Sequence, residues 1–200
     1  EFRRVLFRST SKISAIIQAS IDVKTKILHS SEMLQAISGV VAAIAASLRQ
    51  GKRIYFCGNG GSAADAQHLA AEFSGRFYVD REALPAEALH CNTSYLTAVA
   101  NDYSYEVVYS RLIGGIGQSG DILVGLSTSG NSANIVKAFE TARSKKITTI
   151  GFTGSGGGKM SACSDHLLAV PSSDTPRIQE SHILIGHIIC QLVEEDYFRK

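Results

Sequence analysis

The amino-acid sequence predicts an α/β fold in which a parallel sheet is covered by helices on both faces. Apolar runs at 54–57, 122–126 and 147–152 are short enough to be buried strands. Each is followed by a turn rich in glycine or hydroxyl side chains, and the first two turns lead into segments with helical character. Strands and helices that alternate in this way are typical of a parallel sheet, because parallel neighbours need a long crossover connection.

Two helices are expected before the first strand. Isoleucines recur at loosely helical spacing in residues 11–29. A clearer apolar stripe runs from Ser31 to Gln50, and Gly51 ends it. Two amphipathic helices are more than is needed to cover one face of a small sheet, so we expect these helices to cover a partner subunit as well.

The domain organisation is expected to be simple. The chain has 200 residues, of which 44% are hydrophobic, enough for one domain with a sizeable core. Residues 1–10 hold three arginines and two phenylalanines without a continuing period, and we expect them to be a non-native leader. Residues 11–200 then form one domain, with helices in 11–50 and the α/β core in 51–200.

The core begins with the strand Ile54–Cys57, which stops at a glycine turn. Ser62 is expected to be the N-cap of an alanine-rich helix that follows the turn. The remaining strands are expected at 86–90, 122–126, 147–152 and 166–170. The remaining helices are expected at 93–101, 104–116, 133–145 and 178–197.

Polar turns at the strand ends are the first candidate site. In a parallel sheet the ligand lies beyond the carboxyl ends of the strands. Ser127, Thr128, Ser129 and Ser132 place four hydroxyls between a strand and the start of a helix, a pattern that favours a phosphate site. The alternative is an ordinary capping turn, for which one hydroxyl suffices. Neither a Walker loop nor the full dinucleotide glycine spacing is present, so NAD and ATP are not expected.

A second candidate site involves side chains on two helices. His68 and Glu72 are four residues apart on one helix face, as a metal site or a proton-transfer pair requires. The alternative is a solvated ion pair. On the last helix, His187 lies in an apolar run, where a histidine is usually a core residue. Gln179 precedes it by eight residues, about 80° around the helix, so both can border one cavity.

The charge, the cysteine content and the hydropathy of the chain argue against several classes of protein. The net charge of +2 and the lack of long basic runs argue against a nucleic-acid partner. The four cysteines are widely spaced without a paired pattern, which indicates a reduced, cytoplasmic protein. No segment is expected to be long and apolar enough to cross a membrane, and the N-terminus does not have the pattern of a signal peptide.

Several motifs together resemble the sugar isomerase (SIS) domain family. The similarity extends from about residue 12 to the end of the chain, in the order and spacing of that family. Within the family, the motifs are similar to those of the phosphoheptose isomerases. The motifs that carry the resemblance are Gly58-Asn-Gly-Gly-Ser62, Asp65-Ala-x-His68-x-x-x-Glu72, Gly75-Arg76, Ala100-Asn-Asp102, Leu126-Ser-Thr-Ser-Gly-Asn-Ser132 and Arg177-Ile-Gln-Glu180.

The resemblance implies a fold, an assembly and an activity. It implies a three-layer αβα sandwich with a five-stranded parallel sheet, and a homotetramer with active sites at subunit contacts. It also implies conversion of sedoheptulose 7-phosphate to D-glycero-D-manno-heptose 7-phosphate through an enediol, as the first step of nucleotide-activated heptose biosynthesis. One zinc ion is implied for each subunit; whether turnover requires it is left open.

Residue roles follow from the resemblance position by position. Glu72 is the implied base on carbon, and His187 the implied acid–base group for the oxygens. The implied metal ligands are His68, Glu72, Gln179 and His187. The implied phosphate ligands are Ser127, Thr128, Ser129 and Ser132. The implied contacts to the rest of the sugar are Asn59, Gly60, Gly61, Glu72, Asn101, Asp102 and Gln179.

Two other functions are considered. One is a non-catalytic SIS-domain module that regulates the replication initiator; such a regulator lacks the carboxylate and the last histidine, whereas this chain has Glu72 and His187. The other is isomerisation of a different sugar phosphate. An arabinose 5-phosphate isomerase with its usual regulatory domains would need a longer chain, and sequence alone does not separate seven carbons from six.

Overall fold

The computed structural model describes residues 2–198, with side chains described from Thr10 onward. Five parallel strands form one sheet in the order β2-β1-β3-β4-β5. The strands are β1 (Ile54–Gly58), β2 (Ala86–Ala88), β3 (Ile122–Ser127), β4 (Thr148–Thr153) and β5 (His166–Ala169). The helices are α1 (Phe2–Leu28), α2 (Ser31–Arg49), α3 (Gly61–Ser74), α4 (Thr93–Asp102), α5 (Val108–Ile116), α6 (Ala133–Ser144) and α7 (Thr175–Phe198), with 3₁₀ turns η1 (Tyr105–Val107) and η2 (Gly158–Ala162).

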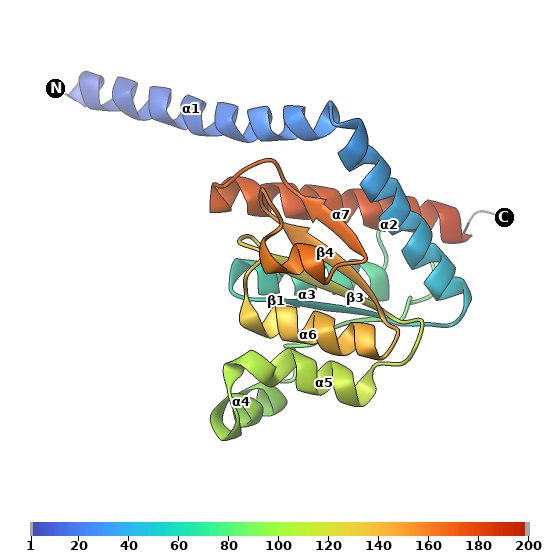
Figure 1. Ribbon diagram of the computed structural model, residues 1–200. Coiled ribbons are helices and arrows are strands. Elements are labelled where there is room, and N and C mark those ends of the chain that lie inside the picture. The colour runs from blue at the N-terminus through green and yellow to red at the C-terminus, as the bar shows by residue number, and fades with distance from the viewer. Residues whose placement is uncertain (1, 199–200) are drawn as a thin grey trace.

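Alternation along the strands divides the core into two layers. Phe56 of β1 faces a cluster built from α2, α3 and α7, and the neighbouring Tyr55 faces a cluster built from α5 and α6. Side chains of a strand alternate between the two faces, so an apolar strand such as β1 supplies both clusters. The predicted three-layer αβα sandwich with a five-stranded parallel sheet is therefore confirmed (Figure 1).

The N-terminal helices are present, and α1 extends away from the body of the molecule (Figure 1). The helix begins at Phe2 and not near residue 11, so residues 2–10 continue the helical backbone; Glu1 lies outside the described residues. Ile13, Ile16 and Ile17 are 54–55% exposed on α1. An apolar stripe is therefore left open to solvent along this helix.

Helix α2 corrects one sequence expectation. Its 19 residues are long and apolar enough to cross a membrane by length and composition, although no such segment was expected. In the fold α2 packs against α7 and β5, with Ile37, Val40 and Ile44 in the core. The same composition suits a helix that covers a sheet, because its inward face contacts apolar side chains.

The start of α3 is a second correction. Ser62 is not the N-cap: α3 begins at Gly61, and Gly60 precedes it with a φ of 56°. Ser62 is buried in the first turn, and its carbonyl lies so close to Gly58 that a Cβ there would be 2.3 Å from the oxygen. The glycines let the chain turn from strand to helix within a few residues.

Candidate active site

The hydroxyl-rich loop between β3 and α6 is held in place by the glycine turn after β4. The Gly154 N–H donates to the Thr128 carbonyl at 2.9 Å, and the Met160 N–H donates to the Gly130 carbonyl at 2.9 Å. Gly130 has a φ of +65°, and a Cβ there would lie 2.1 Å from the Gly157 carbonyl oxygen. The two loops therefore form one packed surface at the carboxyl edge of the sheet.

The hydroxyls of this loop do not cap α6. Ser132 precedes the helix, but its side chain makes no capping bond. Its Oγ lies 2.9 Å from the Oγ of buried Ser127. Ser129 is exposed, and its Oγ accepts a hydrogen bond from the Asn131 N–H at 3.2 Å. The capping-turn alternative is therefore not met at Ser132, whose hydroxyl pairs with that of Ser127 at the start of α6.

Asn59 connects the turn after β1 to the same helix. Its amide forms reciprocal hydrogen bonds with the amide of Asn134, both at 2.9 Å. The Tyr105 hydroxyl also donates to Asn59 Oδ1 at 3.0 Å. Asn134 is only 3% exposed and was missed by sequence reasoning. The available signal was its place two residues after Ser132, in the first turn of α6.

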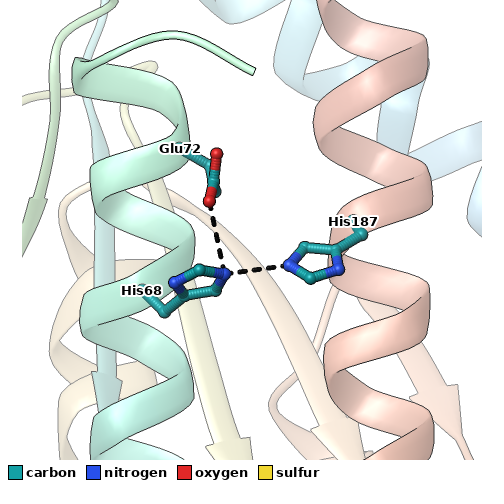
Figure 2. A group of neighbouring side chains, drawn as sticks. All are labelled: His68, Glu72 and His187. Carbon is teal, nitrogen blue, oxygen red and sulfur yellow. Dashed lines mark hydrogen bonds and ion pairs between the residues drawn. The ribbon is translucent and has the colours of Figure 1, made fainter. Parts of the chain in front are cut away.

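His68, Glu72 and His187 meet on the facing sides of α3 and α7 (Figure 2). His68 Nε2 lies 3.3 Å from Glu72 Oε1. It also lies 2.9 Å from His187 Nε2, in a hydrogen bond for which one imidazole supplies the proton. The expectation that His68 and Glu72 share a helix face is confirmed, and His187 is brought to them from 119 positions along the chain.

The donor atoms of these three side chains fit a metal ion. They lie within 4.8 Å of one another. Imidazole nitrogen and carboxylate oxygen are ordinary zinc ligands, and tetrahedral zinc at about 2.1 Å holds two ligand nitrogens about 3.4 Å apart. The two Nε2 atoms would need to separate by only about 0.5 Å from their 2.9 Å contact. The group therefore has the ligand types and the spacing that a metal ion needs.

Asp65 and Phe77 border this group. Burial raises the pKa of the Asp65 carboxyl, and the nearby His68 and His187 partly offset that effect. The Phe77 ring lies 5.7 Å from the His187 ring, measured between centroids. The group therefore has an aromatic ring beside His187 and a carboxyl group that interacts electrostatically with both histidines.

Gln179 contacts a different part of α3. A Cβ on Gly61 would lie 2.6 Å from Gln179 Nε2, so the amide is packed against the glycine turn. Gly61 precedes His68 by seven residues, roughly 10 Å along the helix axis. The helices α3 and α7 thus meet at Gly61 and Gln179, and again two turns later at His68 and His187.

Asn101 and Asp102 lie apart from these groups. They are exposed at the end of α4, where Asn101 Nδ2 donates to Asp102 Oδ1 at 2.9 Å. Among residues 10–198, the hydrogen bonds of His68, Glu72 and His187 do not include either of these side chains. Helix α4 packs against η1 and α5, on the face of the sheet opposite α7.

Residues 18–154 match the SIS domain family. The chain belongs to this family. It is 50% identical over 186 residues to the phosphoheptose isomerase of Clostridium acetobutylicum, covering 93% of this chain and 95% of that protein. It is 53% identical over 187 residues to the phosphoheptose isomerase of Aneurinibacillus thermoaerophilus, covering 94% of each. Within the SIS domain family the chain therefore belongs with the phosphoheptose isomerases, which are enzymes.

Solved structures agree with this assignment. The phosphoheptose isomerase of Neisseria gonorrhoeae matches with a TM-score of 0.87 and 39% identity, covering 93% of this chain and 98% of that chain. The enzyme of Francisella tularensis matches with a TM-score of 0.89 and 33% identity, covering 94% and 98%. The fold and the family are thus supported by sequence and by structure.

Proposed function

We propose that this protein isomerises sedoheptulose 7-phosphate to D-glycero-D-manno-heptose 7-phosphate. The observation that carries the proposal is the group formed by His68, Glu72 and His187 on the facing sides of α3 and α7 (Figure 2). Relatives with half of their residues identical are named phosphoheptose isomerases. The hydroxyls of Ser127, Thr128, Ser129 and Ser132 are proposed to bind the phosphate. They would do so together with N–H groups at the start of α6.

The proposed reaction moves a proton between neighbouring carbons. Glu72 takes a proton from the carbon beside the ketone, and an enediol forms as the ketone oxygen gains a proton. Glu72 then returns its proton to the former carbonyl carbon, and the hydroxyl on the first carbon loses its proton to give the aldehyde. His187 is proposed to exchange these protons with the oxygens, since imidazole can act both as acid and as base near neutral pH.

The metal is proposed to be zinc, one ion for each subunit. His68, Glu72 and His187 would hold it. Gln179 is the fourth ligand that the family resemblance implies, and its amide would first have to leave its contact with Gly61 to reach the ion. When bound, zinc would polarise the sugar carbonyl. Asn59, Gly60, Gly61, Asn101 and Asp102 are proposed to contact the sugar. The Asn59 amide is already bonded to Asn134, which favours contact through the backbone of the turn.

We also propose a cytoplasmic homotetramer with active sites at subunit contacts, formed by a single domain in residues 11–200. The exposed isoleucine stripe on α1 supports self-association, because contiguous apolar surface on a projecting helix favours burial against another copy. The exposed positions of Asn101 and Asp102 are consistent with this arrangement, in which a neighbouring subunit completes the site.

Turnover of sedoheptulose 7-phosphate by the purified protein tests this proposal. Glu72→Gln keeps the size of the side chain but removes the base, so turnover should fall at least a thousandfold, at the upper part of the range for general acid–base catalysis. The substrate should still bind. Glu140→Gln, at an exposed position of α6, is the matched control and should keep the wild-type rate.

Turnover is also measured with added zinc and with a chelator. Loss of turnover with chelator and its recovery with zinc would support a catalytic metal. A Glu72→Gln enzyme with near wild-type turnover would refute the assigned base. A folded wild-type protein without turnover would refute the substrate, and would favour another sugar phosphate or a binding module.

A further inference from the structure

The segment between α3 and β2 is fixed by a buried ion pair. Arg81 Nε lies 2.7 Å from Glu194 Oε2, and each side chain is 3% exposed. Arg81 belongs to this segment, and Glu194 belongs to α7. Buried ionised groups are rare in proteins, because removing each charge from water is costly. A pair buried this completely therefore needs many hydrogen bonds to persist.

Arg81 makes these bonds at the end of α3. Its Nη2 donates to the Glu72 carbonyl at 2.9 Å, and its Nη1 donates to the carbonyls of Phe73 at 2.9 Å and Gly75 at 3.2 Å. The last carbonyls of a helix have no partner within the helix and carry partial negative charge. Arg81 thus caps the helix end at the residue that carries the proposed catalytic carboxylate.

Glu194 makes the complementary bonds with the segment. Its carboxylate accepts the backbone N–H groups of Phe77 at 3.1 Å, Tyr78 at 2.8 Å and Val79 at 2.9 Å. Burial alone raises the pKa of Glu194, but these N–H groups and Arg81 outweigh it, so the pKa lies below its ordinary value. The carboxylate therefore stays ionised and holds Phe77 beside His187.

Both helices of the candidate active site end in this one network. His68 and Glu72 are on α3, whose last turn Arg81 binds. His187 is on α7, seven residues before Glu194 and therefore on nearly the same helix face. A buried ion pair is weak evidence for stability, since apolar residues of similar volume often stabilise as well or better. The effect of the ion pair on geometry is more specific than its effect on stability, because a planar guanidinium holds several acceptor groups in fixed positions at once.

We propose that Arg81 and Glu194 are positioning residues that set the spacing of α3 and α7, and with it the geometry of His68, Glu72 and His187. The catalytic part of this inference rests on the proposed function. Neither residue touches the reacting atoms. Both act through the Glu72 backbone and through the segment that carries Phe77.

Arg81→Lys and Glu194→Gln test the inference. Lysine keeps the positive charge but lacks the planar fork of donors, and glutamine keeps the side-chain length but removes the charge and turns one acceptor oxygen into a donor. The matched controls are Arg49→Lys and Asp196→Asn, in the exposed ion pair that joins α2 to α7 at 2.9 Å. Thermal unfolding first establishes that each variant is folded. Three readouts follow: kcat and KM for sedoheptulose 7-phosphate, affinity for Co²⁺ followed by its visible spectrum, and the imidazole NMR signals of His68 and His187 without metal.

The expected result is specific to the buried pair. In Arg81→Lys and Glu194→Gln, kcat should fall at least tenfold while KM changes less than threefold. Co²⁺ affinity should also fall at least tenfold, as is usual when residues behind metal ligands are replaced. The imidazole signals of both histidines should shift. The two control variants should match the wild type in all three readouts.

The two proposals fail in different ways. A wild-type protein that does not turn over the sugar refutes the proposed substrate, while the Co²⁺ and NMR readouts still test the positioning role. Folded Arg81→Lys and Glu194→Gln proteins with wild-type Co²⁺ affinity and unchanged imidazole signals would refute the positioning role, whatever the substrate.

Discussion

Replacing His182 with glutamine is expected to remove about 2 kcal/mol of the stability that the protein loses between pH 7 and pH 5. His182 on α7 is fully buried, and its Nε2 donates to the Thr153 carbonyl at 3.0 Å. Its Nδ1 has no hydrogen-bond partner. Burial lowers the pKa of His182 from the ordinary 6.5 to about 4, and the bond to Thr153 offsets this only in part. The imidazole is therefore neutral in the folded protein at neutral pH.

The sign and size of the effect follow from proton linkage. As pH falls below 6.5, the unfolded chain binds a proton at His182 before the folded protein does, so acidification favours unfolding. The stability from this histidine is complete above that pH and is lost as pH falls toward 4. Between pH 7 and pH 5 the loss is about 2 kcal/mol, and over the whole window about 3 kcal/mol.

Urea unfolding at pH 7, 6 and 5 and at one protein concentration measures this loss. His182→Gln keeps an amide donor for the Thr153 carbonyl but does not titrate, so the free energy of unfolding should change less with pH by about 2 kcal/mol. His29→Gln, at an exposed turn between α1 and α2, is the control and should behave like the wild type. An equal pH 7 to pH 5 loss in His182→Gln and wild type would refute the reasoning.

Two further predictions concern the site and the assembly. Gly61→Ala places a methyl group 2.6 Å from Gln179 Nε2. The Gln179 amide can move away from this methyl group, so the stability of the protein should be kept. Turnover should fall about tenfold, because the amide is then misplaced. Gly115→Ala, which has open space around it, is the control, and equal turnover in the two variants would contradict this role of Gln179. Replacing both Ile13 and Ile17 with serine should give an assembly of lower mass than the wild type in analytical ultracentrifugation. Ile116→Ser, at an exposed position of α5, is the control and should keep the wild-type mass. An unchanged mass of the double variant would exclude α1 from the subunit interface.

Local patterns in the sequence determined much of the fold. Apolar runs, glycine turns and helical spacing are properties of neighbouring residues, and they predicted all five strands and the seven helices. The parallel arrangement followed, since strands alternating with helices place their turns at one edge. The pairing of His68 with Glu72 was predictable for the same reason, because a helix fixes the direction of side chains four residues apart.

The start of α3 could not be read from residue types alone. Ser62 has the side chain of a good N-cap, but the close approach of Gly58 to its carbonyl places it inside the helix. The partner of Asn59 was equally hidden. Asn134 looks like an ordinary polar residue of a helix start until α6 is placed against the turn after β1.

The sequence by itself determined the α/β fold, the family and the three side chains proposed for chemistry. Only the tertiary structure decided which of them meet and what holds them there. His68 and His187 are in contact because α3 and α7 pack together. Arg81 forms its ion pair with Glu194, which lies 113 positions away along the chain. Such contacts depend on how helices pack on the sheet and on the rotamers that fit between them, and no local pattern encodes either.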